Sequence, residues 1–189
     1  MERPRVLPDV NVCFPISLLD LVLRLDEAEL HQVVWTEDLL DELARVWVEH
    51  GARSAETAGK VCDDIRAAFV GQDVARHEYE DLIDSMPGSD SDDHAHAAAA
   101  VARAPCVLLT KNTKDFPAEI LAVRGVAVRE PDDYLTALFD QHPDELVDVV
   151  REMAADRRNP PMTANDIIDA LGSAGVPDFA ARVRRRLSR

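Results

Sequence analysis

Short β-like segments alternate with helical patterns through the first 135 residues, and this alternation limits the possible folds more than any other feature. Apolar runs typical of strands occur at Arg5–Asp9, Gln32–Trp35, Cys106–Thr110 and Val126–Arg129. The segments between them place apolar residues at helical spacing. Strands separated by helices pair in parallel and bury both faces of the sheet under helices. We therefore predict an α/β fold, a three-layer α/β/α sandwich with a mostly parallel central sheet.

The pattern changes after about Pro143, where only helical segments remain, at 144–154, 163–171 and 178–187. Proline-rich and glycine-containing stretches separate these three segments. We predict two parts: an α/β domain over residues 1–140 and a small all-helical C-terminal subdomain over residues 141–189.

The chain is strongly acidic, with a formal net charge of −15 over 189 residues. Residues 1–135 carry 13 Lys and Arg against 27 Asp and Glu, a net charge of −14, so the acidity belongs to the first part. Such a charge disfavours a protein that grips nucleic acid through a broad basic surface. It fits a carboxylate-rich site that needs cations, or a basic partner. The arginines at 182, 184, 185 and 186 favour a solvated helix end, with RNA or partner contact as a second interpretation.

The sequence also indicates where the protein resides. No apolar run approaches the roughly 20 residues of a membrane span, and the first ten residues lack a signal-peptide pattern. Cys13, Cys62 and Cys106 are odd in number and lack disulfide or zinc spacing, which favours reduced thiols. We expect a cytoplasmic protein without membrane contact.

Four acidic residues stand at positions that a parallel sheet could bring together. Asp9 ends the first strand, and Asp115 follows the strand at 106–110 after a short turn. Both should emerge at the carboxyl edge, where ligands of such sheets bind. Glu42 and Asp93 lie on predicted helices that could converge on the same edge. Carboxylates that lie close together need a compensating cation, and Mg²⁺ or Mn²⁺ prefers oxygen ligands.

Each of these acids also has an ordinary structural interpretation. Asp9, Asp93 and Asp115 could cap or begin helices, where the helix dipole favours negative charge. Glu42 has neighbours of the same type on its helix, at Glu37, Asp38 and Asp41. Four candidates on separate segments therefore carry more weight together than any one of them alone.

Four segments, in this order, resemble the motifs of PIN-domain nucleases. They are Val6–Val12, Leu40–Arg45, Asp92–Ala99 and Leu109–Pro117. The chain is most similar to bacterial VapC-type toxins, including longer members with a helical C-terminal extension. The resemblance covers about residues 4–135 and implies a PIN-like sandwich and an endoribonuclease that depends on Mg²⁺ or Mn²⁺.

The resemblance also implies roles for particular residues. The family's acidic, metal-binding and catalytic positions fall on Asp9, Glu42, Asp93 and Asp115, with Asp92 as the neighbour that could replace Asp93. Its supporting polar positions fall on Asn11, Thr110 and Asn112, which would orient carboxylates, water or phosphate. The implied partners are an RNA substrate, a small antitoxin protein of a type II toxin–antitoxin pair, and a second copy in a homodimer.

Two other functions compete with the nuclease. A non-catalytic module could dock a basic peptide on the acidic edge without any metal. A phosphotransferase could use Asp9 as an aspartyl nucleophile, but such enzymes usually have a second Asp two residues later, where this chain has Asn11.

Overall fold

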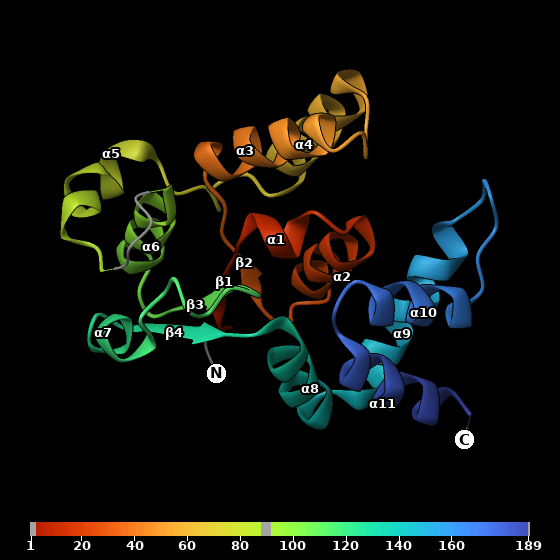
Figure 1. Ribbon diagram of the computed structural model, residues 1–189. Coiled ribbons are helices and arrows are strands. Elements are labelled where there is room, and N and C mark those ends of the chain that lie inside the picture. The colour runs from red at the N-terminus through yellow and green to blue at the C-terminus, as the bar shows by residue number, and fades with distance from the viewer. Residues whose placement is uncertain (1–2, 88–91, 189) are drawn as a thin grey trace.

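The computed structural model describes residues 3–87 and 92–188, and it contains one parallel sheet flanked by helices (Figure 1). The strands are β1 (Arg5–Pro8), β2 (Gln32–Val33), β3 (Cys106–Leu109) and β4 (Val126–Arg129). Their order is β2-β1-β3-β4, and each neighbouring pair is parallel. The predicted α/β sandwich is confirmed.

The helices fill the segments between and after the strands. Their bounds are α1 Val10–Cys13, α2 Ile16–Glu27, α3 Glu37–Glu49, α4 Ala55–Ala68, α5 Arg76–Tyr79, a 3-10 turn Glu80–Ser85, α6 Asp92–Ala102, α7 Ala118–Val123, α8 Pro131–Gln141, α9 Pro143–Asp156, α10 Ala164–Ser173 and α11 Pro177–Leu187. Among these described helices, none is long and apolar enough to cross a bilayer.

The sheet separates two buried clusters because successive side chains of a strand point to opposite faces. Leu7 and Leu108 belong to the cluster formed with α3, α4, α6 and α7. Val6 and Leu109 belong to the other cluster, formed with α2 and the C-terminal helices α8 to α11. The C-terminal helices therefore share a core with the sheet, and Figure 1 shows α8 below β4 and α9 to α11 to the right of α2.

Pro8 lies inside β1 although proline cannot donate a ladder hydrogen bond. Val34 N donates to Val6 O at 2.8 Å on the β2 side, whereas Asp9 N donates to Leu109 O at 2.8 Å on the β3 side. The backbone groups of successive residues point to alternate sides of a strand. Pro8 therefore points toward the β2 side, at a position where β2 has already ended. The proline therefore costs no bond with β2, and the pairing with β3 continues through Asp9.

Two local expectations differ from the structure. Serine is a common N-cap residue, so Ser17 would be expected to cap the helix that follows it, but α2 begins at Ile16 and its N-cap is Pro15. The short helix α1, directly after Asp9, was not expected. By contrast, Thr36 caps α3 and Ser54 caps α4, as their sequences indicate, through bonds to Leu39 N and Thr57 N.

Candidate active site

A pocket of about 450 Å³ lies beyond the carboxyl ends of β1 and β3. The chain runs from β1 toward one edge of the sheet and from β3 toward the other. In α/β proteins, ligands bind between two strands whose connections diverge in this way. We call it the acidic pocket. Its polar lining consists of Asp9, Asn11, Glu42, His50, Asp93, Lys111 and Asn112.

Asp9 is held by a compact polar network at the ends of the two central strands. Its Oδ2 accepts a hydrogen bond of 2.6 Å from Thr110 Oγ1 and another from Asn11 Nδ2. Thr110 is fully buried, and its Oγ1 also accepts from Asn112 N at 3.0 Å. These donors are neutral, so they fix the direction of the Asp9 carboxylate without neutralising its charge.

The loop after β3 is joined to the loop after β1 through Asn11. Asn11 Oδ1 accepts a hydrogen bond of 3.0 Å from Lys111 N, while Asn11 Nδ2 lies 3.2 Å from Thr110 Oγ1. Asn11, Thr110 and Asn112 are thus brought together around Asp9, as supporting groups would be.

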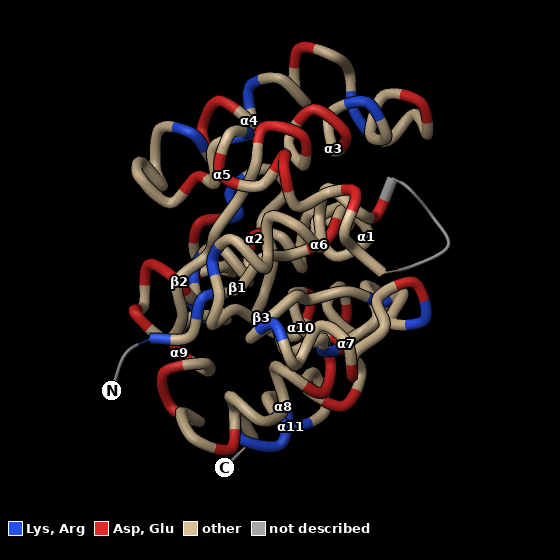
Figure 2. Tube along the Cα trace, turned by 90° about the vertical axis from the view of Figure 1, so that its left-hand side faces the viewer, with Lys and Arg blue, Asp and Glu red and all other residues tan. Residues whose placement is uncertain are grey.

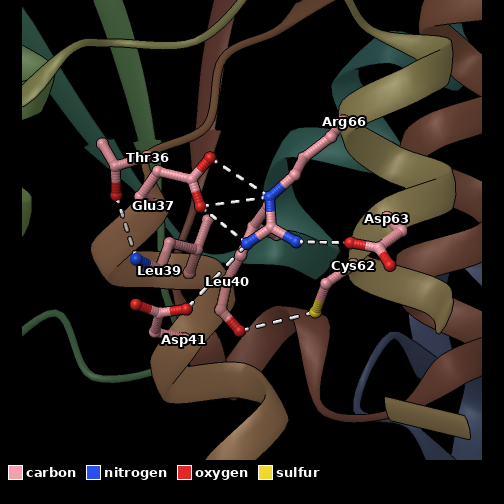
Figure 3. Close-up of polar contacts among 8 residues, drawn as sticks. All are labelled: Thr36, Glu37, Leu39, Leu40, Asp41, Cys62, Asp63 and Arg66. Carbon is pink, nitrogen blue, oxygen red and sulfur yellow. Dashed lines mark hydrogen bonds and ion pairs between the residues drawn. The ribbon is translucent and has the colours of Figure 1, made fainter. Parts of the chain in front are cut away.

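Glu42 is the one acid among its rivals on α3 that lines the acidic pocket. Glu37 is bound by Arg66 of α4 at 2.6 Å, and Asp41 lies 3.9 Å from the same guanidinium (Figure 3). Asp38 accepts hydrogen bonds from Arg76 and from Tyr79 Oη. The rival acids therefore fasten α3 to its neighbours, which holds the helix that carries Glu42.

Asp93 lines the pocket from the first turn of α6. The side chain of Asp92 lies outside the described residues, so the choice between Asp92 and Asp93 stays a prediction. Asp115 is not part of the lining; its Oδ2 accepts a hydrogen bond from Asn112 Nδ2. Three of the four predicted acids therefore share one pocket, and the fourth reaches it through Asn112.

Oxygen donors dominate this pocket, which matches the chemistry of Mg²⁺ or Mn²⁺. Within residues 3–87 and 92–188, no three His, Cys, Asp or Glu side chains are close enough to hold one metal ion together. Mg²⁺ commonly keeps several waters and takes one or two protein carboxylates. The residues present fit an ion held in that manner.

Two histidines near the site are not among the predicted site residues. His50 ends α3, lines the pocket and contacts Phe14 edge-to-face at 5.8 Å between centroids. His96 lies against Phe116, and its buried Nε2 has no hydrogen-bond partner in the described part of the chain. Burial lowers the pKa of His96, although the charge of Asp9 acts in the opposite direction. Nothing in the local sequence distinguishes His50 from an ordinary helix residue.

The comparisons with known proteins agree with this architecture. Residues 131–185 match the family model described as the VapC50 C-terminal domain. A stretch of 107 residues, 57% of this chain, is 37% identical to the protein named "Putative ribonuclease VapC50" of Mycobacterium tuberculosis (strain ATCC 25618 / H37Rv). Over these two stretches the chain is similar to VapC50-type proteins.

The matched stretch spans 62% of the length of that relative. No solved structure matches this chain. The family match begins at Pro131, the start of α8, whereas the predicted subdomain begins at residue 141. The division at 140/141 itself stays a prediction.

Proposed function

We propose that this chain is an endoribonuclease that depends on Mg²⁺ or Mn²⁺. The observation that carries the proposal is the joint lining of one pocket by Asp9, Glu42 and Asp93 at the switch point of the sheet. The name of the M. tuberculosis relative, a ribonuclease, supports the same reaction class. RNA is the proposed substrate, and hydrolysis of its phosphodiester bonds is the proposed reaction.

Asp9 and Asp93 would hold the principal ion, with Asp115 acting beside them through its contact with Asn112. Thr110 and Asn11 keep Oδ2 of Asp9 in a fixed direction, which spares the site that reorganisation during the reaction. Glu42 would bind a second ion or accept the proton of the attacking water. A bound ion would stabilise negative charge on the phosphate oxygens and lower the pKa of water.

The decisive experiment compares purified wild-type protein with Asp93→Asn on a panel of structured and unstructured RNAs. Reactions contain Mg²⁺, Mn²⁺ or a chelator, and RNA ends are mapped by sequencing. Asp148→Asn is the matched control, because Asp148 pairs with Arg151 on the exposed surface of α9. Cleavage should require metal and disappear in Asp93→Asn but not in Asp148→Asn. Equal cleavage by wild type and Asp93→Asn would refute the proposal.

We further propose that the chain is the toxin of a type II toxin–antitoxin pair. The net charge of −14 over residues 1–135 suits a basic segment of a small antitoxin. A short reading frame beside the gene, whose product binds this protein and blocks cleavage, is the expected finding. A gene without such a neighbour would contradict the toxin assignment and leave the nuclease assignment standing. Homodimerisation stays a prediction, to be measured by light scattering.

A further inference from the structure

The turn between α10 and α11 is hydrogen-bonded to a residue that lines the acidic pocket. Lys111 follows β3 and lines the pocket. Its Nζ donates a hydrogen bond of 2.7 Å to Ala174 O, in the C-terminal helices. Residues that are 63 positions apart are thus joined at the edge of the pocket.

The chemistry of the turn suits a bound ammonium group. Ala174 is the C-cap of α10, so its carbonyl lies at the negative end of the helix dipole. Burial is the main influence on the pKa of Lys111 and lowers it. A hydrogen bond to a carbonyl at a helix end compensates a partly buried cation for lost water.

Gly175 lies directly beside the lysine side chain that reaches this carbonyl. A Cβ at position 175 would lie 3.4 Å from Lys111 Cε and 3.5 Å from Nζ. Gly175 also has φ of +99°, a conformation that other residues rarely adopt. The backbone shape of the turn therefore depends on glycine, and the side chain of Lys111 packs directly against it.

The backbone of Lys111 continues the connection to Asp9. Lys111 N donates to Asn11 Oδ1 at 3.0 Å, and Asn11 Nδ2 donates to Asp9 Oδ2. The flanking Thr110 donates to the same oxygen at 2.6 Å. A lysine held at its side-chain end is therefore also bonded, through its amide, to the group that orients Asp9.

We propose that the α10–α11 turn positions the acidic site by holding Lys111, which makes Lys111 a positioning residue and gives the C-terminal helices a role in activity. The effect on cleavage rests on the proposed nuclease function; the effect on the loop does not. The competing role for Lys111 is direct contact with an RNA phosphate.

The first test uses the protein without metal and RNA. Hydrogen exchange of the residue 111 amide is measured by NMR in wild type, Lys111→Met, Gly175→Ala and the double variant. Loss of the hydrogen bond between Lys111 Nζ and Ala174 O should speed this exchange at least about tenfold in each single variant. The double variant should exchange little faster than the single variants, because both changes break the same connection. Unchanged exchange in Lys111→Met would overturn the proposal.

Gly51→Ala is the matched control for strain at a positive φ. Gly51 has φ of +65°, and no atom of the described residues lies within 4 Å of an added Cβ. It should destabilise the protein without changing exchange at residue 111. If Gly175→Ala fails to fold, Lys111→Met alone still decides the test. Lys111 lies outside the helices and strands, and methionine has a side chain of similar length, so this variant should fold.

The second test measures cleavage with saturating metal. Lys111→Met and Gly175→Ala should each lower kcat about tenfold with KM for RNA nearly unchanged, and their effects should not add. A rise in KM with a smaller salt dependence of RNA binding, confined to Lys111→Met, would instead assign phosphate contact and overturn the proposal. If wild type cuts no RNA, the nuclease proposal fails, while the exchange experiment still decides whether the turn holds the loop.

Discussion

Carboxylates are used differently at the sheet edge and in the C-terminal helices. In the C-terminal part, arginines of α11 pair with acids of neighbouring helices: Arg182 with Asp140, Arg184 with Asp169 and Arg186 with Asp144. At the sheet edge, Asp9 is held by a hydroxyl and an amide. Figure 2 shows basic positions in the α11 region close to acidic ones. The acids that fasten α11 therefore have charged partners, whereas the two side chains that donate to Asp9 are neutral.

Asp9→Asn gives the sharpest form of this comparison and the largest expected effect. An amide keeps the size of the side chain but removes the charge that would hold metal, so cleavage should fall by about 1,000-fold or more. Unfolding in urea should change little, because the bonds to Oδ2 are compatible with an amide oxygen. Single-turnover kinetics and urea titration measure both quantities. Retained cleavage with lost stability would place Asp9 among the fastening acids.

Lowering the pH should weaken the packing of the C-terminal helices against the α/β part. His31 is fully buried; its Nε2 donates to Val22 O at 2.8 Å, so its Nδ1 accepts from Tyr134 Oη at 3.0 Å. Burial lowers the pKa of His31 to about 4. Below a pH of about 6.5 the unfolded chain binds a proton that the folded chain does not, so stability falls with pH.

The loss should reach about 3 kcal/mol between pH 6.5 and pH 4, from the difference between the two pKa values. Urea unfolding across this range measures it, with His31→Gln as the comparison. The variant should be less stable at pH 7 and should lose less stability on acidification. An identical pH dependence in both proteins would show that other groups control it.

Local signals in the sequence predicted much of the fold and less of the site. Thr36 and Ser54 are caps, and the Ala-rich stretch at 97–100 packs without exposed surface. Such features depend on neighbours a few residues away. Helix α1 was missed because four residues carry no periodicity, and Ser17 was misjudged because a nearby proline already begins α2.

The site could be predicted only as far as strand ends define it. Asp9 follows β1 and therefore lies at the carboxyl edge in any parallel sheet. Choosing Glu42 over Glu37 needs the position of Arg66, which lies on another helix. The tie between Lys111 and Ala174 depends on how the C-terminal helices pack, and neither residue has a sequence signal for it.

Asp132 offers a fastening acid whose loss should have an intermediate effect. Its carboxylate accepts hydrogen bonds from Asp178 N at 3.0 Å and Phe179 N at 2.8 Å, at the start of α11. Asp132→Ala leaves these amides without their acceptor, which should cost about 1–2 kcal/mol of stability. Urea unfolding measures the loss, with Asp133→Ala as the neighbouring control. A change below the error of the control would mean that water replaces the carboxylate.

The smallest effect is expected for the arginine pairs of α11. Arg186 lies 2.6 Å from Asp144, but the two side chains are 40% and 70% exposed. Water and salt screen such pairs, so Arg186→Gln should change stability by less than about 1 kcal/mol.

The same variant distinguishes two roles for the basic end of α11. If Arg186 only pairs with Asp144, the salt dependence of RNA binding stays the same, whereas an RNA contact would lower its slope by about one unit. The pairing favours the first result, because a guanidinium held by a carboxylate must give up that partner before it can bind phosphate.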